Sequence, residues 1–501
     1  MKKHQKYEDK SLDTVREALR RIWGYEDFRS PQGEIVQSLL RRQDALIVLP
    51  TGGGKSICFQ LPALLQSGLT LVVSPLVALM ENQVQELRDR RQRGALLHSQ
   101  MDKQERKKTL LALERNQLRL LYLSPETLLS ESVWQRLCQP EVQINGLILD
   151  EAHCLVQWGD TFRPAYRRLG AARKSLQQSK PGKTKIAIAA FTATADPAAQ
   201  RTIQNVLQLQ KPKRFLLSPY RANLDLNVKI AWTPRSRRQQ LLNFIRKQKY
   251  TTGLVYVRSR AYSERLAAWL GECGYATSAY HAGLSAEERR LIESAWLSGK
   301  MQFVVCTSGF GMGINKPDVR WVIHFQVPAL LSEYIQEVGR AGRDGKPALA
   351  LSLVSECTGW LDPEDKQRRQ LLVSKQRSLY RQAQGLAKKL PQQGSVQEVA
   401  EQFRDGAIAL SVLHRAGQLQ WKDPFHYAIQ PSRSLVKANF DAIEQMTQYL
   451  KTRRCRWQFL LEAFGFPQEA KTLPCGHCDN CRSGFGLGRQ ARSPVSVETK
   501  G

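Results

Sequence analysis

An apolar run followed at once by a glycine-rich turn constrains the fold of this chain more than any other feature. The run is 45–49, and the heptapeptide Pro-Thr-Gly-Gly-Gly-Lys-Ser at 50–56 leads into a second apolar stretch, 57–61. This order predicts a buried strand, a tight turn and the start of a helix. Glycines let backbone N–H groups curve around phosphate oxygens at a helix N-terminus, where the helix dipole favours an anion. The pattern therefore predicts an α/β domain that holds a nucleotide triphosphate.

Each residue of this turn has an expected task. Lys55 would reach the β- and γ-phosphates, and Ser56 would be a ligand of Mg²⁺. The first glycine of the common P-loop pattern is missing because position 49 is Leu, so the match is to the shorter Thr-Gly-Gly-Gly-Lys-Ser form. A glycine-rich turn with a surface lysine is the alternative. The residues of the turn predicted to bind ATP are Thr51, Gly52, Gly53, Gly54, Lys55 and Ser56.

Two carboxylates after a second apolar run argue against that alternative. The run 146–149 is followed directly by Asp150 and Glu151. The carboxyl edge of a parallel strand is where an α/β sheet places catalytic groups, and an Asp there can hold Mg²⁺. We interpret Asp150 as this metal ligand and Glu151 as the base that orients the attacking water. A polar loop after a strand is the other reading, and the glycine-rich turn disfavours it.

Two arginines near position 340 supply the cations that phosphoryl transfer also needs. Arg340 and Arg343 are three residues apart, which would place them on one face of a helix. An arginine finger of this kind stabilises the charge that develops on the γ-phosphate. A solvated basic helix end is the alternative. Because the pair lies far along the chain from Lys55, we expect it on a second lobe, so that ATP binding and hydrolysis change the geometry between two lobes.

Taken together, these motifs make the chain resemble the superfamily 2 helicases, and within them the RecQ-type DNA helicases, from about residue 19 to residue 481. The resemblance implies two RecA-like lobes and an ATP-driven DNA motor. Besides the segments above, it is carried by Trp-Gly-Tyr-x-x-Phe-Arg-x-x-Gln at 23–32, Val-Ser-Pro-Leu at 73–76, Tyr-Leu-Ser-Pro-Glu at 122–126, Phe-Thr-Ala-Thr-Ala at 191–195, Tyr-His-Ala-Gly at 280–283 and the stretch 310–320.

The resemblance also implies roles for single residues. Gln32, with Arg29, resembles the element that reads adenine, since an amide can pair with N6 and N7 of the base. Arg343 resembles the arginine finger and Arg340 its neighbour in coupling. His153 resembles the residue that links hydrolysis to DNA. The other residues that resemble coupling positions are Thr192, Thr194, Gly311, Gly313 and Asp318.

The segment 153–168, directly after the carboxylates, resembles the aromatic-rich loop that separates RecQ-type proteins from other members of the superfamily. It interleaves aromatic rings with arginines, which could stack on bases and grip phosphates beside the ATP site. A packed loop with its rings in the core is the alternative. Asp160, Thr161 and Ala165 depart from the family pattern. The residues predicted to contact DNA are Trp158, Phe162, Arg163 and Tyr166.

The charge of the chain agrees with a polyanionic partner. Its 75 Lys and Arg against 45 Asp and Glu give a net charge of +30, which favours nucleic acid over an acidic small substrate. A ribosomal or membrane-surface protein would show the same excess. No apolar run approaches the roughly 20 residues of a membrane span. We expect a cytoplasmic protein, in the nucleoid if the source is prokaryotic, that acts as a monomer on single-stranded and duplex DNA, with a single-strand-binding protein as a further partner.

Four of the ten cysteines form a cluster. Cys475, Cys478 and Cys481 are three residues apart, and Cys455 precedes them on an expected helix. This spacing fits a tetrahedral Zn²⁺ site of four thiolates. A disulfide pair is the alternative, which a reducing cytosol disfavours, and His477 could replace one thiolate, although the resemblance favours Cys475. The expected cofactors are therefore ATP, Mg²⁺ and Zn²⁺.

These motifs divide the chain into five regions. Alternating strand and helix patterns predict an α/β fold, with one RecA-like lobe at 1–217 and a second at 218–360. A helical and winged-helix-like region is expected at 361–450 and a zinc-binding subdomain at 451–483. The tail at 484–501 is expected to be disordered, with no further C-terminal domain.

The region 361–450 is longer than a short helical connection requires. Residues 395–400 and 408–417 look like two short helices, and residues 418–421 and 426–429 look like a hairpin. Helices followed by a hairpin is the winged-helix plan, which in RecQ-type proteins usually follows the zinc site. We therefore predict a winged-helix-like insertion before the zinc site, with a plain helical insertion as the alternative.

The sequence as a whole predicts an ATP-dependent DNA helicase that moves 3′ to 5′ along single-stranded DNA, in DNA recombination, repair or replication. Its polarity is implied by the resemblance alone. An RNA helicase of the DEAH or DEAD type is the first alternative, and the aromatic-rich segment and the cysteine cluster argue against it. A non-enzymatic DNA-binding adaptor is the second, and the intact Lys55, Asp150, Glu151 and Arg343 argue against that.

Overall fold

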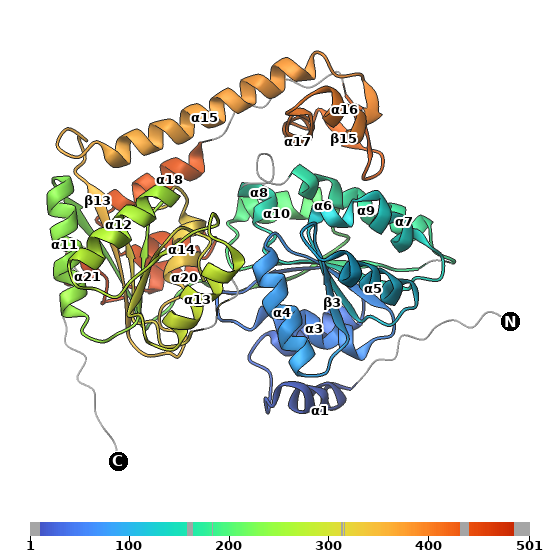
Figure 1. Cartoon of the computed structure of the whole chain (residues 1–501), viewed down its shortest axis with the longest axis horizontal. Helices are drawn as coiled ribbons and strands as arrows, with labels where there is room; N and C mark the ends of the chain where they lie inside the picture. The colour runs from blue at the N-terminus through green and yellow to red at the C-terminus, as the bar shows by residue number, and fades with distance from the viewer. Residues whose placement is uncertain are drawn as a thin grey trace. The chain divides into compact units, whose positions relative to one another are not determined.

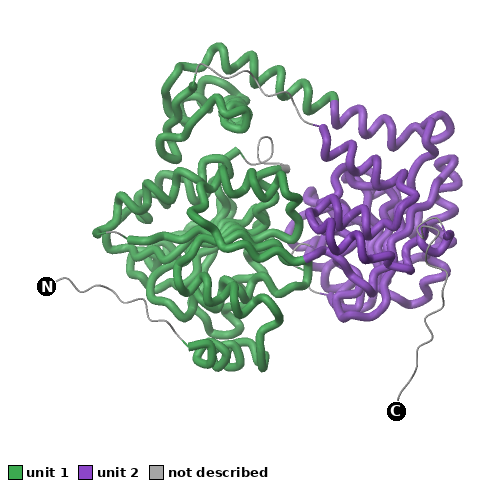
Figure 2. Tube along the Cα trace, turned by 180° about the vertical axis from the view of Figure 1, so that it is seen from behind, with its two compact units in different colours: residues 1–217, 312–314, 374–438 green, residues 218–311, 315–373, 439–501 purple. Residues whose placement is uncertain are grey.

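The computed structural model describes residues 11–157, 164–182, 184–311, 314, 316–430 and 440–484. The chain divides into two compact units (Figure 2). Unit 1 comprises residues 1–217, 312–314 and 374–438, and unit 2 comprises residues 218–311, 315–373 and 439–501. The division at residue 217 coincides with the end of the first predicted lobe. The segment 374–438 groups with unit 1, whereas the cysteine cluster groups with unit 2.

A seven-stranded sheet forms the centre of unit 1 (Figure 1). Its strands are β1 (Ala45–Val48), β2 (Leu69–Val73), β3 (Gly94–Leu97), β4 (Leu120–Leu123), β5 (Ile144–Leu149), β6 (Ala187–Thr192) and β7 (Lys213–Leu216). All neighbours in the order β3-β4-β2-β5-β6-β1-β7 are parallel. Every residue of β1, β2, β4, β5 and β6 is buried, as expected for a parallel sheet covered on both faces.

Helices cover both faces of this sheet. The helices of this part of the chain are α1 (Leu12–Trp23), which packs on α2 and α3, α2 (Gln32–Leu40), α3 (Lys55–Leu65), α4 (Val77–Asp89), α5 (Lys103–Glu114), α6 (Pro125–Leu128), α7 (Glu131–Cys138), α8 (Cys154–Gln157), the 3-10 helix η1 (Pro164–Arg168), α9 (Leu169–Gln178) and α10 (Pro197–Val206). Buried side chains of α2, α3 and α4 form the core on one face, and those of α7, α9 and α10 form the core on the other. The α/β class predicted for this part of the chain is confirmed.

Unit 2 contains a second parallel sheet of six strands in the order β10-β11-β9-β12-β13-β8. Its strands are β8 (Leu224–Ala231), β9 (Gly253–Tyr256), β10 (Ala279–Tyr280), β11 (Phe303–Cys306), β12 (Trp321–His324) and β13 (Ala348–Ser355). The helices between them are α11 (Pro234–Lys247), α12 (Arg260–Glu272), α13 (Ala286–Leu297) and α14 (Leu331–Val338). The chain thus has the two parallel-sheet lobes that the sequence predicts.

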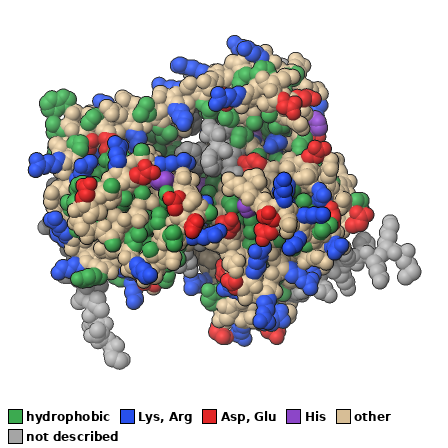
Figure 3. Space-filling model, viewed as in Figure 1, with side chains coloured by type: hydrophobic (Ala, Val, Ile, Leu, Met, Phe, Trp, Pro, Cys, Tyr) green, Lys and Arg blue, Asp and Glu red, His purple; other side chains and the backbone are tan. Residues whose placement is uncertain are grey.

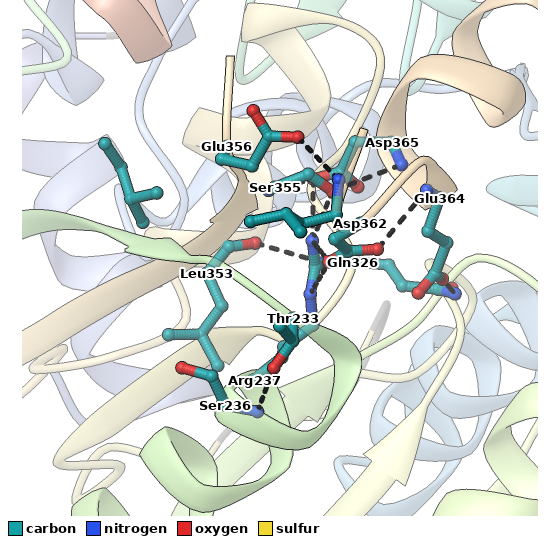
Figure 4. A network of polar contacts seen from close by, with 12 residues as sticks. Thr233, Ser236, Arg237, Gln326, Leu353, Ser355, Glu356, Asp362, Glu364 and Asp365 are labelled. Carbon is teal, nitrogen blue, oxygen red and sulfur yellow. Dashed lines mark hydrogen bonds and ion pairs between the residues drawn. The ribbon is translucent and has the colours of Figure 1, made fainter. Parts of the chain in front are cut away.

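A buried arginine ties the end of the second sheet to the helix that follows it (Figure 4). Arg237 on α11 is 1% exposed, and its guanidinium donates to Asp362 (2.9 Å), Asp365 (3.0 Å) and the Ser355 hydroxyl (2.7 Å). Asp365 lies in the first turn of α15 (Glu364–Ala387). Removal of one partner from a buried pair leaves a charge unpaired in the interior, which is strongly destabilising. The network therefore fixes the start of α15 on unit 2.

Residues 391–430 form a small module within unit 1. Its elements are β14 (Gln393–Ser395), α16 (Val396–Gln402), α17 (Gly406–Arg415), β15 (Leu419–Trp421) and β16 (His426–Ile429). β15 and β16 form an antiparallel hairpin, and β14 pairs with the other edge of β16. The predicted hairpin is confirmed, and two helices followed by a hairpin is the winged-helix-like order. The alternative of a plain helical insertion is wrong.

The last described part of the chain, 440–484, packs in unit 2. It contains α18 (Asp441–Lys451), α19 (Arg456–Ala463), α20 (Pro467–Thr472) and α21 (Asp479–Arg482). Asp479 accepts from the backbone N–H of Val228 on β8 (2.8 Å) and from the guanidinium of Arg456 (2.5 Å). The cysteine-rich region is therefore attached to the edge strand of the second sheet. The predicted tail beyond residue 484 lies outside the described residues.

None of the helices in the described part of the chain is long and apolar enough to cross a membrane.

Candidate functional site

The phosphate-binding turn lies between β1 and α3, as the sequence predicts. Lys55 is the first residue of α3, so the turn meets the helix at its N-terminus. Gly52 and Gly54 have φ values of 86° and 69°, in the left-handed region that favours glycine. A Cβ on Gly54 would lie 2.3 Å from Nε2 of Gln32. Residue 54 must therefore be glycine, both for its backbone conformation and for the close approach of Gln32.

Gln32 connects the predicted adenine-reading element to this turn. It is buried at the start of α2. Its Nε2 donates to the carbonyl of Gly53 (3.0 Å), and its Oε1 accepts from the N–H of Arg29 (3.0 Å). Both ends of the amide thus have backbone partners. Adenine recognition by Gln32 and Arg29 stays a prediction, and the observed contacts give Gln32 a further task, which is to hold the turn.

The two predicted carboxylates follow β5 and lie beside the turn. Asp150 is buried, and Oε1 of Glu151 lies 3.8 Å from Nζ of Lys55. Glu151 has a φ of 50°, a conformation that costs a residue with a Cβ about 1–3 kcal/mol. Such strain persists where the surrounding structure fixes the residue, and it is concentrated at functional sites. The fold thus brings Lys55 next to Asp150 and Glu151, which lie far from it in the sequence. Ser56 follows Lys55 in the first turn of α3.

The electrostatics of Asp150 suit a cation ligand. Burial, and then the negative charge of Glu151, raise its pKa well above the usual value, and Lys55 opposes the shift. Two neighbouring carboxylates repel each other, and here Lys55 offsets the repulsion only in part. A divalent ion would stabilise the ionised form of Asp150. The donor set of Asp150 and the Ser56 hydroxyl therefore fits the oxygen ligands that Mg²⁺ prefers.

His153 joins the carboxylates to the segment after β6. Its Nδ1 lies 3.2 Å from Oε2 of Glu151 and 3.2 Å from Oγ1 of Thr192. The Thr192 hydroxyl donates to the carbonyl of Thr194 and accepts from its N–H, both at 3.1 Å. The three predicted coupling residues of unit 1 therefore form a continuous line of contacts that starts at Glu151. The coupling role itself stays a prediction.

Arg340 and Arg343 lie in unit 2 beyond the end of α14. The helix ends at Val338, and turns follow it. The prediction that the two arginines share a helical face is therefore wrong. Gly342 between them has a φ of 61°, which is outside the helical region and favours a turn. Burial, and then repulsion from Arg340, lower the pKa of Arg343 to about 10, so the guanidinium of Arg343 keeps its positive charge near neutral pH.

One of the predicted coupling residues in unit 2 touches this arginine motif. Gly311 has a φ of 80°, and a Cβ on it would lie 2.7 Å from Nη1 of Arg340. Asp318 is exposed and pairs with Lys316 at 3.3 Å. Gly313 lies outside the described residues. The roles of these three residues stay predictions.

A buried ion-pair network that the sequence motifs did not reveal supports the arginine motif. Glu337 on α14 accepts two N–H bonds from Arg258 (2.8 and 2.6 Å) and lies 2.9 Å from Nε2 of His324. Burial alone would raise the pKa of Glu337, but Arg258 and then His324 lower it to about 2. Glu337 lies inside the predicted arginine motif, three residues before Arg340, and that position is the one signal that could have drawn attention to it.

Of the four predicted DNA contacts, one lies in the described part of the chain. Trp158, Phe162 and Arg163 fall outside it. Tyr166, on η1, is fully buried in the core between the first sheet and the helices α7, α9 and α10. Because its ring offers no open face on which a base could stack, the prediction of Tyr166 as a DNA contact is wrong. For this residue the packed-core alternative holds.

The four clustered cysteines have the arrangement of a metal centre. Their Sγ atoms all lie within 4.8 Å of one another, and Cys455, Cys478 and Cys481 are buried. The backbone N–H groups of Arg456 and Cys478 point at sulfur atoms of the cluster, at 3.5 and 3.3 Å. All four are free thiols, not disulfides. The chemistry of this donor set fits Zn²⁺. Cys455 is the N-cap of α19, at the start of a helix.

His477 is not a member of the cluster. Its Nδ1 lies 2.9 Å from a carboxylate oxygen of Asp225 on β8, and its Nε2 lies 3.5 Å from the hydroxyl of Tyr220. The alternative in which His477 replaces a thiolate is therefore wrong, and Cys475 is the fourth candidate ligand. His477 instead helps to attach the cysteine-rich segment to unit 2.

Family models match three parts of the chain. The DEAD/DEAH box helicase model matches residues 29–202, and the helicase conserved C-terminal domain model matches residues 236–345. These ranges fall on the two parallel sheets. The RecQ zinc-binding model matches residues 425–482 and so begins in the hairpin of the small module, ahead of the predicted start at 451. The combination defines a helicase of superfamily 2.

Similar proteins identify the family within superfamily 2. The ATP-dependent DNA helicase RecQ of Synechocystis sp. is 54% identical over 474 residues, which cover 94% of this chain and 98% of that protein. The ATP-dependent DNA helicase RecQ of Bacillus subtilis is 30% identical over 486 residues, 97% of this chain and 70% of that protein. The chain therefore belongs to the RecQ family of helicases.

Solved structures show the same fold at low sequence identity. The structure of S. cerevisiae Dbp5 bound to RNA and ADP BeF3 has a TM-score of 0.56 and 18% identity to this chain. The match covers 69% of this chain and 90% of that one. At this identity the likeness concerns the fold alone.

Proposed function

We propose that this chain is an ATP-dependent DNA helicase that moves 3′ to 5′ along single-stranded DNA and separates duplexes. The observation that carries the proposal is the unbroken line of contacts from Lys55 through Glu151 and His153 to Thr192. Residues joined in this way can pass a change at the γ-phosphate to a neighbouring segment. Membership of the RecQ family and the net charge of +30 support DNA as the partner.

The residues of unit 1 divide the hydrolysis step between them. Lys55 and the N–H groups at the start of α3 would bind the β- and γ-phosphates. Ser56 and Asp150 would hold Mg²⁺, which neutralises the charge that develops on the phosphates. Glu151 would orient a water molecule and accept its proton as the bond between the γ-phosphorus and the bridging oxygen breaks and ADP leaves.

Unit 2 would contribute charge and rigidity. Arg343, the proposed arginine finger, and Arg340 would stabilise the negative charge of the transferred phosphoryl group. Zn²⁺ on the four thiolates would join Cys455 at the start of α19 to the segment around α21, a structural role.

The proposal extends to partners and place of action. Single-stranded and duplex DNA are the proposed partners, together with a single-strand-binding protein, and the proposed form is a monomer in the cytoplasm that serves DNA recombination, repair or replication. Lys and Arg side chains are spread over many elements of the face in Figure 3 and are not gathered in one patch. The surface charge there favours a polyanion but does not mark a path for it.

Neither alternative function is favoured. The relatives that match nearly the whole chain are named DNA helicases, not RNA helicases. A non-enzymatic adaptor would not need the contact between Lys55 and Glu151, nor the strained backbone at Glu151.

The decisive experiment measures unwinding of 3′-tailed and 5′-tailed duplexes of DNA and of RNA by the native chain and by Lys55→Ala. We expect ATP-dependent unwinding of the 3′-tailed DNA duplex alone, and a loss of at least about a thousandfold in Lys55→Ala, because the lysine acts directly on the transferred phosphate. Binding of tailed DNA, measured by fluorescence anisotropy, should be retained. Unwinding that survives Lys55→Ala would remove the mechanism, and a preference for RNA or for 5′ tails would remove the proposed substrate or polarity.

A further inference from the structure

In the order of its elements, the small module at 391–430 places α17 at the position of the recognition helix of helix-turn-helix DNA-binding domains. In those proteins the second helix lies in the major groove, so that one of its faces must be open to solvent. α17 has no such face: Ala409, Leu410 and Val412 are buried with most of their neighbours, and of the ten residues only Arg415 is exposed. The helix instead packs against η1. The position that would read DNA is therefore occupied within unit 1.

The tip of the hairpin is occupied as well. The ring of Phe425 meets the ring of Trp134 on α7 edge to face, with centroids 5.4 Å apart and an interplanar angle of 73°. Phe425 also packs against the core beneath the first sheet. The carbonyl of Pro424 accepts an N–H from Arg168, the last residue of η1, at 3.2 Å. A wing that reads DNA presents its tip to solvent, whereas this tip is held by unit 1.

The module and the first sheet also share a core. Ala171 on α9 lies in the same buried cluster as Val399, Leu413 and Tyr427 of the module. The module therefore meets unit 1 in a packed interface, with an aromatic contact to α7, an apolar contact to α9 and a hydrogen bond to η1. Such an interface holds one arrangement, because close-packed side chains do not deform continuously.

The path from this interface to the ATP site is short. η1 contacts α8 as well as α17, and α8 begins at Cys154, one residue after His153. Tyr166 of η1 and Leu155 of α8 are buried in the same core. A shift of the module would therefore disturb η1, and a shift of η1 would disturb α8, which directly follows His153, the residue proposed to link hydrolysis to DNA.

We propose that the module at 391–430 is an internal brace and not a second DNA-binding domain, and that Phe425 is a positioning residue that holds η1 for DNA-dependent ATP hydrolysis. This inference rests on the proposed function, because stimulation by DNA is its readout. Figure 1 places α16, α17 and β15 at the side of unit 1 that carries α8 and α9, in keeping with the printed contacts. The brace acts through η1 and does not itself touch ATP or DNA.

The test compares three variants of the full-length chain in ATPase assays with and without single-stranded DNA. Phe425→Ala should lower the maximal DNA-stimulated rate about tenfold, since loss of an aromatic pair contact is worth a factor of this order. The rate without DNA and the affinity for DNA should change by less than about twofold. Phe425→Leu should restore most of the stimulated rate. Gln420→Ala, an exposed position on the same hairpin, should behave as the native chain.

A second variant keeps the test valid if Phe425→Ala loosens the module. Trp134→Ala removes the other ring of the pair, on α7, without changing the module, and should lower the stimulated rate in the same way. The double variant should be no worse than either single one, because both remove one shared contact. If the single effects add in full, the two rings do not act through their contact and the brace is wrong.

Two further outcomes are distinguishable. If Phe425→Ala weakens binding of DNA duplexes in anisotropy measurements while the maximal stimulated rate is kept, the module is a free DNA-binding domain and the inference is overturned. If the native chain hydrolyses ATP with no stimulation by DNA, the proposed function itself fails, and the inference falls with it.

Discussion

The carboxylates that follow β5 in unit 1 and the ion-pair networks of unit 2 are buried charges of two different kinds. In unit 1, Asp150 and Glu151 lie side by side, and the pKa of Asp150 is raised by burial and by the neighbouring charge. In unit 2, Arg237 has two aspartates as partners, and Glu337 is matched by Arg258 and His324 so well that its pKa falls to about 2. The two carboxylates of the ATP site repel each other, whereas Arg237 and Glu337 are paired within the protein.

The two sets of charges have different functions. In a site that binds a cation and a triphosphate, some charges stay without a full set of opposite charges until the ligand binds. For this reason perturbed pKa values are frequent at functional sites. A scaffold that must keep its geometry pairs its buried charges within the protein. Substitutions of Asp150 and Glu151 should therefore change the rate of hydrolysis with little effect on stability, and substitutions in the Arg237 and Glu337 networks should do the reverse.

The largest effect is expected for Glu151→Gln. Loss of the base should lower the rate of DNA-stimulated ATP hydrolysis by up to about ten thousandfold, corresponding to about 5 kcal/mol in the barrier. The amide keeps the size of the side chain, so ATP affinity should stay within a factor of a few. Because the native glutamate is strained and close to Asp150, the free energy of unfolding should not fall. Steady-state ATPase rates, equilibrium nucleotide binding and urea unfolding measure the three quantities.

Glu131→Gln is the matched control, since Glu131 is an exposed glutamate in the first turn of α7. It should leave all three quantities at their native values. A loss of stability in Glu151→Gln as large, in free energy, as its loss of rate would contradict this assignment, because it would show that the charges of the ATP site also hold the fold.

A smaller effect, now on stability, is expected for Arg237→Met. Methionine keeps much of the volume but leaves Asp362, which is 1% exposed, without its cation. Loss of one partner from a buried pair costs about 3–5 kcal/mol. Hydrogen-exchange mass spectrometry of the full-length chain should show lower protection in β13 and in the first turns of α15, while equilibrium ATP binding by unit 1 stays unchanged.

Arg238→Met provides a control one residue away on α11. Arg238 is exposed, and its guanidinium lies 5.2 Å from the ring centroid of Trp269. An exposed cation over a ring contributes roughly 0.5–1 kcal/mol, so protection should hardly change. Equal losses in the two variants would mean that the burial of the Arg237 network has no special weight.

The parts of the fold and site that could be predicted are those fixed by local chemistry. A glycine-rich turn before a helix is a local pattern that binds phosphate, so Lys55 was found from the sequence. A carboxylate at the end of a buried strand is a local pattern for a Mg²⁺ ligand, so Asp150 was found as well. Repeated short spacing likewise revealed Cys475, Cys478 and Cys481. The hairpin of the small module followed from two short β-rich runs joined by a turn.

The parts that failed depend on the surroundings of a side chain, which a local pattern does not contain. Tyr166 has the residue type of a base-stacking platform, but packing of η1 places it in the core. Arg340 and Arg343 have helical spacing, but Gly342 adopts a positive φ and a turn replaces the helix. Arg258 and Glu337 are 79 positions apart in the sequence, so their pairing comes from the order of strands and from no motif.

The smallest effect, and the sharpest test of the pairing in unit 2, is the pH dependence of Glu337→Gln. The pKa of Glu337 lies near 2 in the folded chain and near 4.5 when it is unperturbed, a difference of about 3 kcal/mol. Because the folded value is the lower one, this stabilisation is complete above about pH 5 and is lost as the pH falls towards 2. Protection of α14 amides in the native chain should exceed that in Glu337→Gln by less at pH 3 than at pH 7, by about 2 kcal/mol.

Glu333, on the same helix, provides a control of opposite sign. Burial raises its pKa to about 7, so the folded chain favours its protonated form and its contribution to stability decreases as the pH rises from about 4.5 to 7. Glu333→Gln should therefore increase protection of α14 relative to the native chain at pH 8, and the gain should shrink on acidification. If both variants followed the same pH trend, the acid response would belong to α14 as a whole, and the pairing of Glu337 with Arg258 would not be its cause.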